Sequence, residues 1–215
     1  MKPLTRIVIF LLAATSIASL LGEMYRLWPM RFFALAVFAP ASGTLIAFAL
    51  YDRWCGDGQA CRTILIGAIA GLVAAVAYDI FRLPFVFSKS WGLAGVIPSL
   101  PLFKVFPLFG AMILGKADGS SLAANVTGWL YHFSNGATFG VMYGALVNGQ
   151  WRRRWPVAIV FAMGLELAML LTPYPATFSI RVTATFVAVT LAAHLIFGIT
   201  MGLASVGLEK WMAKC

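Results

Sequence analysis

Charged residues are scarce in this chain of 215 residues. Only 11% of the residues are Asp, Glu, Lys or Arg, whereas 61% are hydrophobic, and the mean hydropathy is +0.90. An ordinary soluble domain carries about 25% charged residues. The composition therefore excludes a soluble globular domain and predicts an integral membrane protein surrounded by the lipid bilayer.

Acidic residues are rarer than basic ones, with 7 Asp and Glu against 16 Lys and Arg. In a membrane protein, such an excess is typical of loops that face the cytoplasm and its anionic lipids. A nucleic-acid-binding protein needs an exposed basic face, and the long apolar runs of this chain leave no segment for one. Nucleic acid is therefore excluded as a partner.

Motifs of covalent catalysis and of metal binding are missing. The three cysteines are Cys55, Cys61 and Cys215, and the C-x5-C spacing of the first two, without a neighbouring histidine, is not typical of a metal site. The sequence contains no Gly-rich phosphate loop, G-x-S-x-G elbow or H-E-x-x-H motif. No enzyme class is therefore indicated.

Six apolar runs approach the roughly 20 residues that a membrane-spanning helix needs. They cover about residues 7–22, 31–51, 63–81, 122–147, 156–172 and 182–208. The first run follows a basic start and resembles a signal peptide, but no small-x-small cleavage site precedes Glu23, so we interpret it as an uncleaved first helix. We predict an all-α integral membrane protein with one transmembrane domain, residues 1–215, and six helices arranged as repeated antiparallel hairpins.

Residues 88–119 decide between six helices and seven. This segment is apolar in its centre but contains Lys104 and three prolines, Pro98, Pro101 and Pro107. Proline removes a helix donor, and a lysine near the bilayer centre is costly. We expect an extracytoplasmic insert that is interfacial or re-entrant, with a seventh span as the alternative.

Three consecutive arginines, residues 152–154, give the strongest orientation signal. They lie in a short loop between two predicted spans, and such loops face the cytoplasm. With six helices, both termini then lie in the cytoplasm. The expected location is the cytoplasmic (inner) membrane of a bacterium.

The two histidines of the chain, His132 and His194, both lie in long apolar runs and both begin the pattern H-x-x-x-G-x-T-[FM]-G. Ionisable side chains are rare in lipid-spanning helices, because a charged group there costs about 2.5–3.5 kcal/mol. His132 lies about ten residues into its predicted helix and His194 about twelve. Two histidines at matched positions, near the membrane midplane, predict an intramembrane site.

The pattern extends upstream as an internal duplication. Asp79 precedes the helix of His132, and Glu166 precedes the helix of His194. Each unit is an outgoing helix with an acid, a proline-containing turn, and a returning helix with a histidine; residues 122–208 contain the better-defined histidine-bearing helices. Glycines at i+4 spacing from each histidine, such as Gly136 and Gly198, form faces that allow close helix packing, so both histidines should face the bundle interior.

The predicted polar site consists of His132, His194, Asn135 and Glu166, with Asp79 as a further candidate. Our leading hypothesis is that this site binds or translocates a proton, an ion or a small molecule, because intramembrane His and Glu side chains often form relays. A structural or assembly subunit of a membrane complex is an alternative, and a homo-oligomer is a further partner class that the sequence leaves open.

Two other roles for the histidines remain open at this stage. Each ring could be satisfied between helices by Asn135, Tyr131, Thr138 or a backbone carbonyl. Alternatively, His132 and His194 could together ligate haem b, as in a membrane electron-transfer subunit, or a metal ion.

A metal ion would need more ligands than the two histidines. Glu166 or Asp79 could supply one, but sequence spacing positions neither of them. The spacing of Asp79 and Arg82, i and i+3, instead favours an ion pair on one helix face, and Glu23 with Arg26 shows the same spacing.

The segments 131–136 (YHFSNG) and 193–198 (AHLIFG) resemble small uncharacterised bacterial inner-membrane proteins of the YagU-like type. The resemblance covers about 80 residues at the carboxyl end and consists of His and Gly spacing. It implies a polytopic inner-membrane protein and carries no chemistry to this chain.

Overall fold

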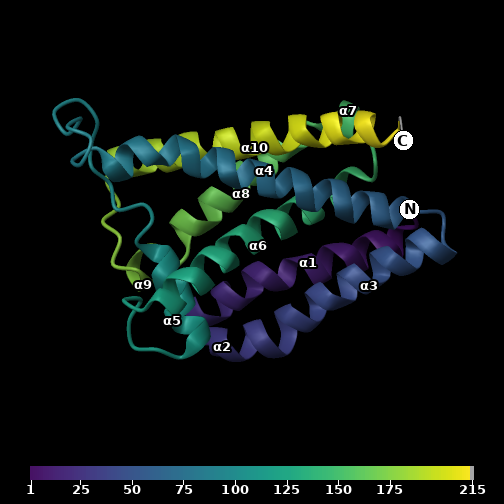
Figure 1. Cartoon of the computed structure of the whole chain (residues 1–215), viewed down its shortest axis with the longest axis horizontal. Coiled ribbons are helices and arrows are strands. Elements are labelled where there is room, and N and C mark those ends of the chain that lie inside the picture. The colour runs from purple at the N-terminus through teal and green to yellow at the C-terminus, as the bar shows by residue number, and fades with distance from the viewer. Residues whose placement is uncertain (214–215) are drawn as a thin grey trace.

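The computed structural model describes residues 1–213, and every regular element in this range is a helix (Figure 1). The elements in chain order are α1 Pro3–Met24, α2 Met30–Phe33, the π-helical turn η1 Ala34–Phe38, α3 Ala39–Cys55, α4 Gln59–Phe87, α5 Val105–Leu114, α6 Leu122–Val147, α7 Trp151–Arg154, α8 Val157–Leu171, α9 Tyr174–Thr177 and α10 Ala184–Met212. The predicted all-α class is confirmed, whereas the last cysteine, Cys215, lies outside the described residues.

Four helical stretches are long and apolar enough to cross a membrane: α1, the continuous stretch 30–55, α4 and α10. They identify a membrane protein. α6 has 26 residues, but polar side chains interrupt its apolar surface. α8 has only 15 residues. At 1.5 Å per residue, α8 is about 22 Å long, shorter than the roughly 30 Å of a hydrocarbon core.

The bundle has two ends, which we name by the chain segments found there. The terminal end holds the start of α1, the connection between α3 and α4, α7 and the end of α10; the distal end holds α5, α9 and residues 88–104 (Figure 1). α4 and α6 lie side by side in the middle, with α10 and α8 on one side and α1 and α3 on the other. α6 and α10 both run from the distal end to the terminal end, as the duplication predicts.

Side-chain caps fix where the two histidine-bearing helices begin. The Ser121 hydroxyl accepts a hydrogen bond from the Ala124 N–H (3.1 Å), and the Thr183 hydroxyl accepts one from the Phe186 N–H (3.1 Å). Such caps satisfy backbone donors that the first helical turn leaves unpaired. Because the caps stand at equivalent places, His132 and His194 are each the eleventh residue of their helix.

Glycines bring α4 and α6 into backbone contact. A Cβ atom at Gly140 would collide with the Gly67 carbonyl oxygen, and one at Gly71 would collide with the Gly136 carbonyl oxygen. On α10, a Cβ at Gly198 would lie 2.7 Å from the Ile159 Cα of α8. The i+4 glycine faces therefore pack as their spacing predicts, and they hold each histidine-bearing helix tightly against the outgoing helix before it.

The turn after α1 corrects one sequence prediction. Glu23 and Arg26 form no ion pair among the described residues; instead, the Glu23 carboxylate accepts a hydrogen bond from the Met30 N–H (2.5 Å). α1 ends at Met24 and Arg26 has a positive φ of 55°. The two side chains therefore do not share a helix face, which the i, i+3 argument requires.

The insert 88–119 contributes one short helix and long connections at the distal end. α5 has 10 residues and is about 15 Å long, half the thickness of a hydrocarbon core. It packs against the first turns of α6, where a Cβ at Gly128 would collide with the Phe106 carbonyl oxygen. α5 therefore covers the distal end of α6, the helix that carries His132.

Candidate functional site

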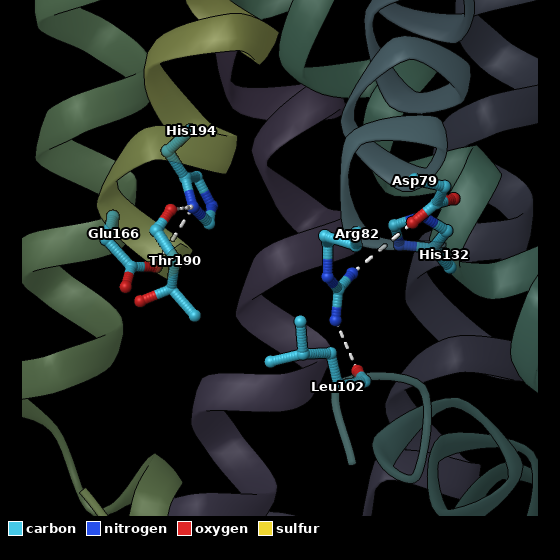
Figure 2. Close-up of polar contacts among 7 residues, drawn as sticks. All are labelled: Asp79, Arg82, Leu102, His132, Glu166, Thr190 and His194. Atoms are coloured by element: carbon cyan, nitrogen blue, oxygen red, sulfur yellow. Dashed lines mark hydrogen bonds and ion pairs between the residues drawn. The ribbon is translucent and has the colours of Figure 1, made fainter. Parts of the chain in front are cut away.

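The first part of the site is a charged cluster between α4 and α6 (Figure 2). The His132 Nε2 lies 2.8 Å from Asp79 Oδ2, and Arg82 donates to Asp79 Oδ1 at 3.3 Å. Arg82 also donates to the Leu102 carbonyl of the insert. The predicted Asp79–Arg82 ion pair is confirmed, and Asp79 additionally holds the histidine of the facing helix.

Arg82 is buried among aromatic rings. It is 4% exposed, and its guanidinium carbon lies 4.6 Å from the Tyr78 ring centroid, 5.0 Å from that of Phe103 and 5.4 Å from that of Phe106. Aromatic faces attract a cation, and a buried charge is tolerated only when it is well partnered. Nevertheless, Arg82 Nε is buried without a hydrogen-bond partner among residues 1–213.

The second part of the site joins α8 and α10. Glu166 is 1% exposed, and its Oε2 lies 3.0 Å from His194 Nδ1. The same Nδ1 lies 3.0 Å from the Thr190 carbonyl oxygen, one turn earlier on α10. The carbonyl has the hydrogen-bond geometry, whereas Glu166 Oε2 has no hydrogen bond within the described part of the chain. Nδ1–H therefore donates to Thr190, and Glu166 lies in contact with the ring.

Tyr78 lies between the two parts. Its ring centroid is 5.0 Å from that of His194 and 6.1 Å from that of His132. The Phe106 ring, which comes from the insert, stacks on the imidazole of His132, with 4.1 Å between the two ring centroids. The ring of Tyr78 thus connects the two histidines, and that of Phe106 covers one face of His132.

Two cavities meet at this tyrosine. The inner cavity has a volume of about 100 Å³ and is lined by His132, Asn135 and His194, among others. The outer cavity has a volume of about 270 Å³, lies toward the distal end and is lined by Glu166. Tyr78 and Arg82, the latter drawn between the two histidine–carboxylate pairs in Figure 2, line both cavities.

The five residues singled out from the sequence are distributed as follows. His132, His194 and Asn135 line one cavity, Glu166 lines the neighbouring cavity, and Asp79 contacts His132. Asn135 bonds neither histidine, and its Oδ1 is buried without a partner in the range that the structure describes.

Of the hydrogen-bond partners considered for the two imidazoles, the backbone carbonyl is confirmed for His194, which bonds Thr190, whereas Tyr131 and Thr138 bond neither histidine. Tyr131 donates to the Ser16 carbonyl (2.7 Å), and the Thr138 hydroxyl lies 2.7 Å from the Ser16 hydroxyl. Both side chains therefore tie α6 to α1, on a face that the imidazole of His132 does not share. The hydrogen-bond partner of His132 is instead Asp79 of α4. Residue spacing within α6 could not predict this contact between two helices.

The arrangement does not fit haem or a metal ion. Among residues 1–213, no group of three or more His, Cys, Asp or Glu side chains is placed to hold a metal ion. His132 Nε2 is held by Asp79, and Tyr78 contacts both imidazoles, where a porphyrin would need to lie. At about 100 Å³, the inner cavity is also well below the roughly 300–1,000 Å³ of ligand pockets.

The most important site residue missed from the sequence is Tyr78. Its signal was the run Tyr78-Asp79-x-x-Arg82, which places three polar groups on adjacent turns of an otherwise apolar helix. Phe106 was missed because it belongs to an insert whose position no pattern in the sequence specifies.

No family model, curated protein or solved structure matches this chain. The resemblance to YagU-like proteins therefore stays a prediction, and the function must be argued from the geometry of the site.

Proposed function

We propose that this protein binds and translocates a proton, an ion or a small molecule at the paired histidine–carboxylate site, with the proton as the first case to test. The observation that carries the proposal is that two histidine–carboxylate pairs, the partly buried Asp79–His132 and the buried Glu166–His194, lie on either side of Tyr78 where two cavities meet. Histidine exchanges protons near neutral pH, and ionisable groups at membrane depth mark ion and proton pathways.

The proposed membrane arrangement is six spans built as repeated hairpins in a bacterial cytoplasmic membrane. It is supported by the order of the groups: in α4–α6 and in α8–α10, the outgoing helix carries the carboxylate and the returning helix carries the histidine as its eleventh residue. α5 would be a re-entrant insert. The three arginines of α7 support a cytoplasmic position for the terminal end and, with it, for both termini.

Cysteine labelling tests this orientation. The native Cys55, which is exposed, lies at the terminal end, and Ser120 lies in the exposed connection between α5 and α6. In a Cys61→Ala, Cys215→Ala background, we expect a membrane-impermeant maleimide to label Cys55 only after the cells are permeabilised. After adding Cys55→Ala, a Ser120→Cys variant should be labelled in intact spheroplasts. The reversed pattern would place the termini outside.

Substitution of the histidines tests the proton function. Purified protein is reconstituted into vesicles that contain a pH-sensitive dye, and a potassium gradient with valinomycin makes the interior negative. We expect the wild type to acidify the interior, and His132→Gln and His194→Gln to reduce the rate by about 100-fold or more, the usual contribution of a positioned proton-transfer group.

Ser134→Ala is the matched control, because the Ser134 hydroxyl bonds its own helix at the Tyr131 carbonyl (2.7 Å) and Ser134 lines neither cavity. It should retain the wild-type rate. All variants are compared at equal amounts of monodisperse protein. Wild-type flux equal to that of protein-free vesicles, or full flux in both histidine variants, would contradict the proposal.

A further inference from the structure

The outer cavity has a different chemical character at its two ends. Lys104 and Arg181 line it and are both exposed, so they lie at its mouth. Glu166 and Arg82 line it and are both buried, so they form its floor. The cavity therefore extends from an exposed pair of cations at the distal end to Glu166 and Arg82 inside the bundle.

The cations at the mouth have no carboxylate partner. Neither Lys104 nor Arg181 forms a salt bridge with another part of the described chain. Lys104 precedes α5 and Arg181 precedes α10, so two segments separated by more than 70 residues bring their charges to one opening. Two unpaired cations at one opening attract an anion.

The wall between mouth and floor is largely apolar. Met169 and Leu170 come from α8, and Phe186 comes from α10; Tyr174 and Phe178 add aromatic surface from the turn between these helices. The volume of about 270 Å³ lies just below the roughly 300–1,000 Å³ of typical ligand pockets. The occupant is therefore small, with a short apolar body.

The floor determines which way such a molecule would lie. Its charged side chains are Arg82 and Glu166, and Asp79 already pairs with Arg82, so the floor offers an anionic group no cation that lacks a carboxylate partner.

We infer that the outer cavity binds an amphipathic organic anion, with its phosphate or carboxylate group between Lys104 and Arg181 and its apolar body against the wall formed by α8, the 172–183 turn and α10. The inference rests on the proposed function and names the class of small molecule that its site binds. It does not depend on proton movement, because binding can be measured without a gradient.

Equilibrium binding of octyl phosphate to the full-length protein in nanodiscs of zwitterionic lipid tests this inference. Octyl phosphate and octanoate should bind saturably, whereas octanol and inorganic phosphate should bind at least about tenfold more weakly, because each lacks one half of the recognised chemistry. A Lys104→Gln, Arg181→Gln variant should lose roughly 10- to 30-fold in affinity, the effect of removing two partly exposed charges.

A Lys89→Gln, Lys116→Gln variant is the control. Both lysines are exposed cations of the same insert, but neither lines the cavity, so this variant should bind like the wild type. All four substituted residues are exposed, so the variants should fold like the wild type. A lower affinity can then be assigned to lost binding contacts. Equal loss in the two double variants, or equal binding of octanol and octyl phosphate, would overturn the inference.

Dioctanoyl phosphatidate distinguishes the source of the anion. Tighter binding of this two-chain compound than of octyl phosphate would identify a membrane lipid, and tighter binding of octyl phosphate would identify a soluble metabolite; both outcomes support the inferred chemistry. Loss of anion binding with intact proton flux would remove only this inference. Intact binding without proton flux would remove the proposed translocation and leave the binding site.

Discussion

A leucine in place of Gly140 is expected to abolish accumulation of folded protein. The backbones of α4 and α6 meet at this glycine, and a Cβ atom there would collide with the Gly67 carbonyl oxygen. Overpacking usually costs about 1–3 kcal/mol because side chains can move aside. Here the obstacle is backbone, so relief requires the two central helices to separate. The measurement is the yield of monodisperse protein from membranes in size-exclusion chromatography.

Gly164→Leu serves as the control for this substitution. Gly164 lies on α8, is exposed, and an added Cβ there would meet nothing within 4 Å. The same change in composition should therefore leave the yield unchanged. Gly140→Ala should give an intermediate yield, since it adds only the first of the colliding atoms. If the Gly140→Leu protein accumulates like the Gly164→Leu protein, α4 and α6 do not pack at this distance.

Local sequence patterns predicted those parts of the fold that depend on local chemistry. Apolar runs located the long helices, and the glycine spacing predicted which faces pack closely, because both signals act within a few helical turns. The i, i+3 spacing worked for Asp79 and Arg82, which share a helix, and was wrong for Glu23 and Arg26, which do not. The spacing is informative only where the helix is continuous.

The contacts within the site could be predicted only in part. The duplication predicted one carboxylate and one histidine for each hairpin, but sequence distance could not show that His132 meets Asp79 through Nε2 while His194 meets Glu166 through Nδ1. Such details depend on the rotation of α6 against α4 and of α10 against α8. The position of Phe106 depends on how the proline-containing insert folds back onto α6, which has no periodic signal.

Removal of the Asp79 carboxylate is expected to destabilise the protein by about 3–5 kcal/mol, the cost of leaving one member of a buried pair uncompensated. Asp79 is the only carboxylate within ion-pair distance of Arg82 in the described chain, and Arg82 is 4% exposed. Asp79→Ala would also take the partner from His132 Nε2. The free energy of unfolding is measured by denaturant titration of the detergent-solubilised protein.

Two further variants separate charge from packing. Asp118→Ala removes an exposed carboxylate and should change the stability little. The double variant Asp79→Asn, Arg82→Met removes both charges and keeps most of the volume, so it should recover much of the stability lost in Asp79→Ala. If the double variant is as unstable as Asp79→Ala, the loss comes from the broken contact with His132 rather than from the unpaired arginine. A cost as small as that of Asp118→Ala would mean that water reaches Arg82 through the cavities, and the charged cluster would then be a hydrated pathway rather than a sealed one.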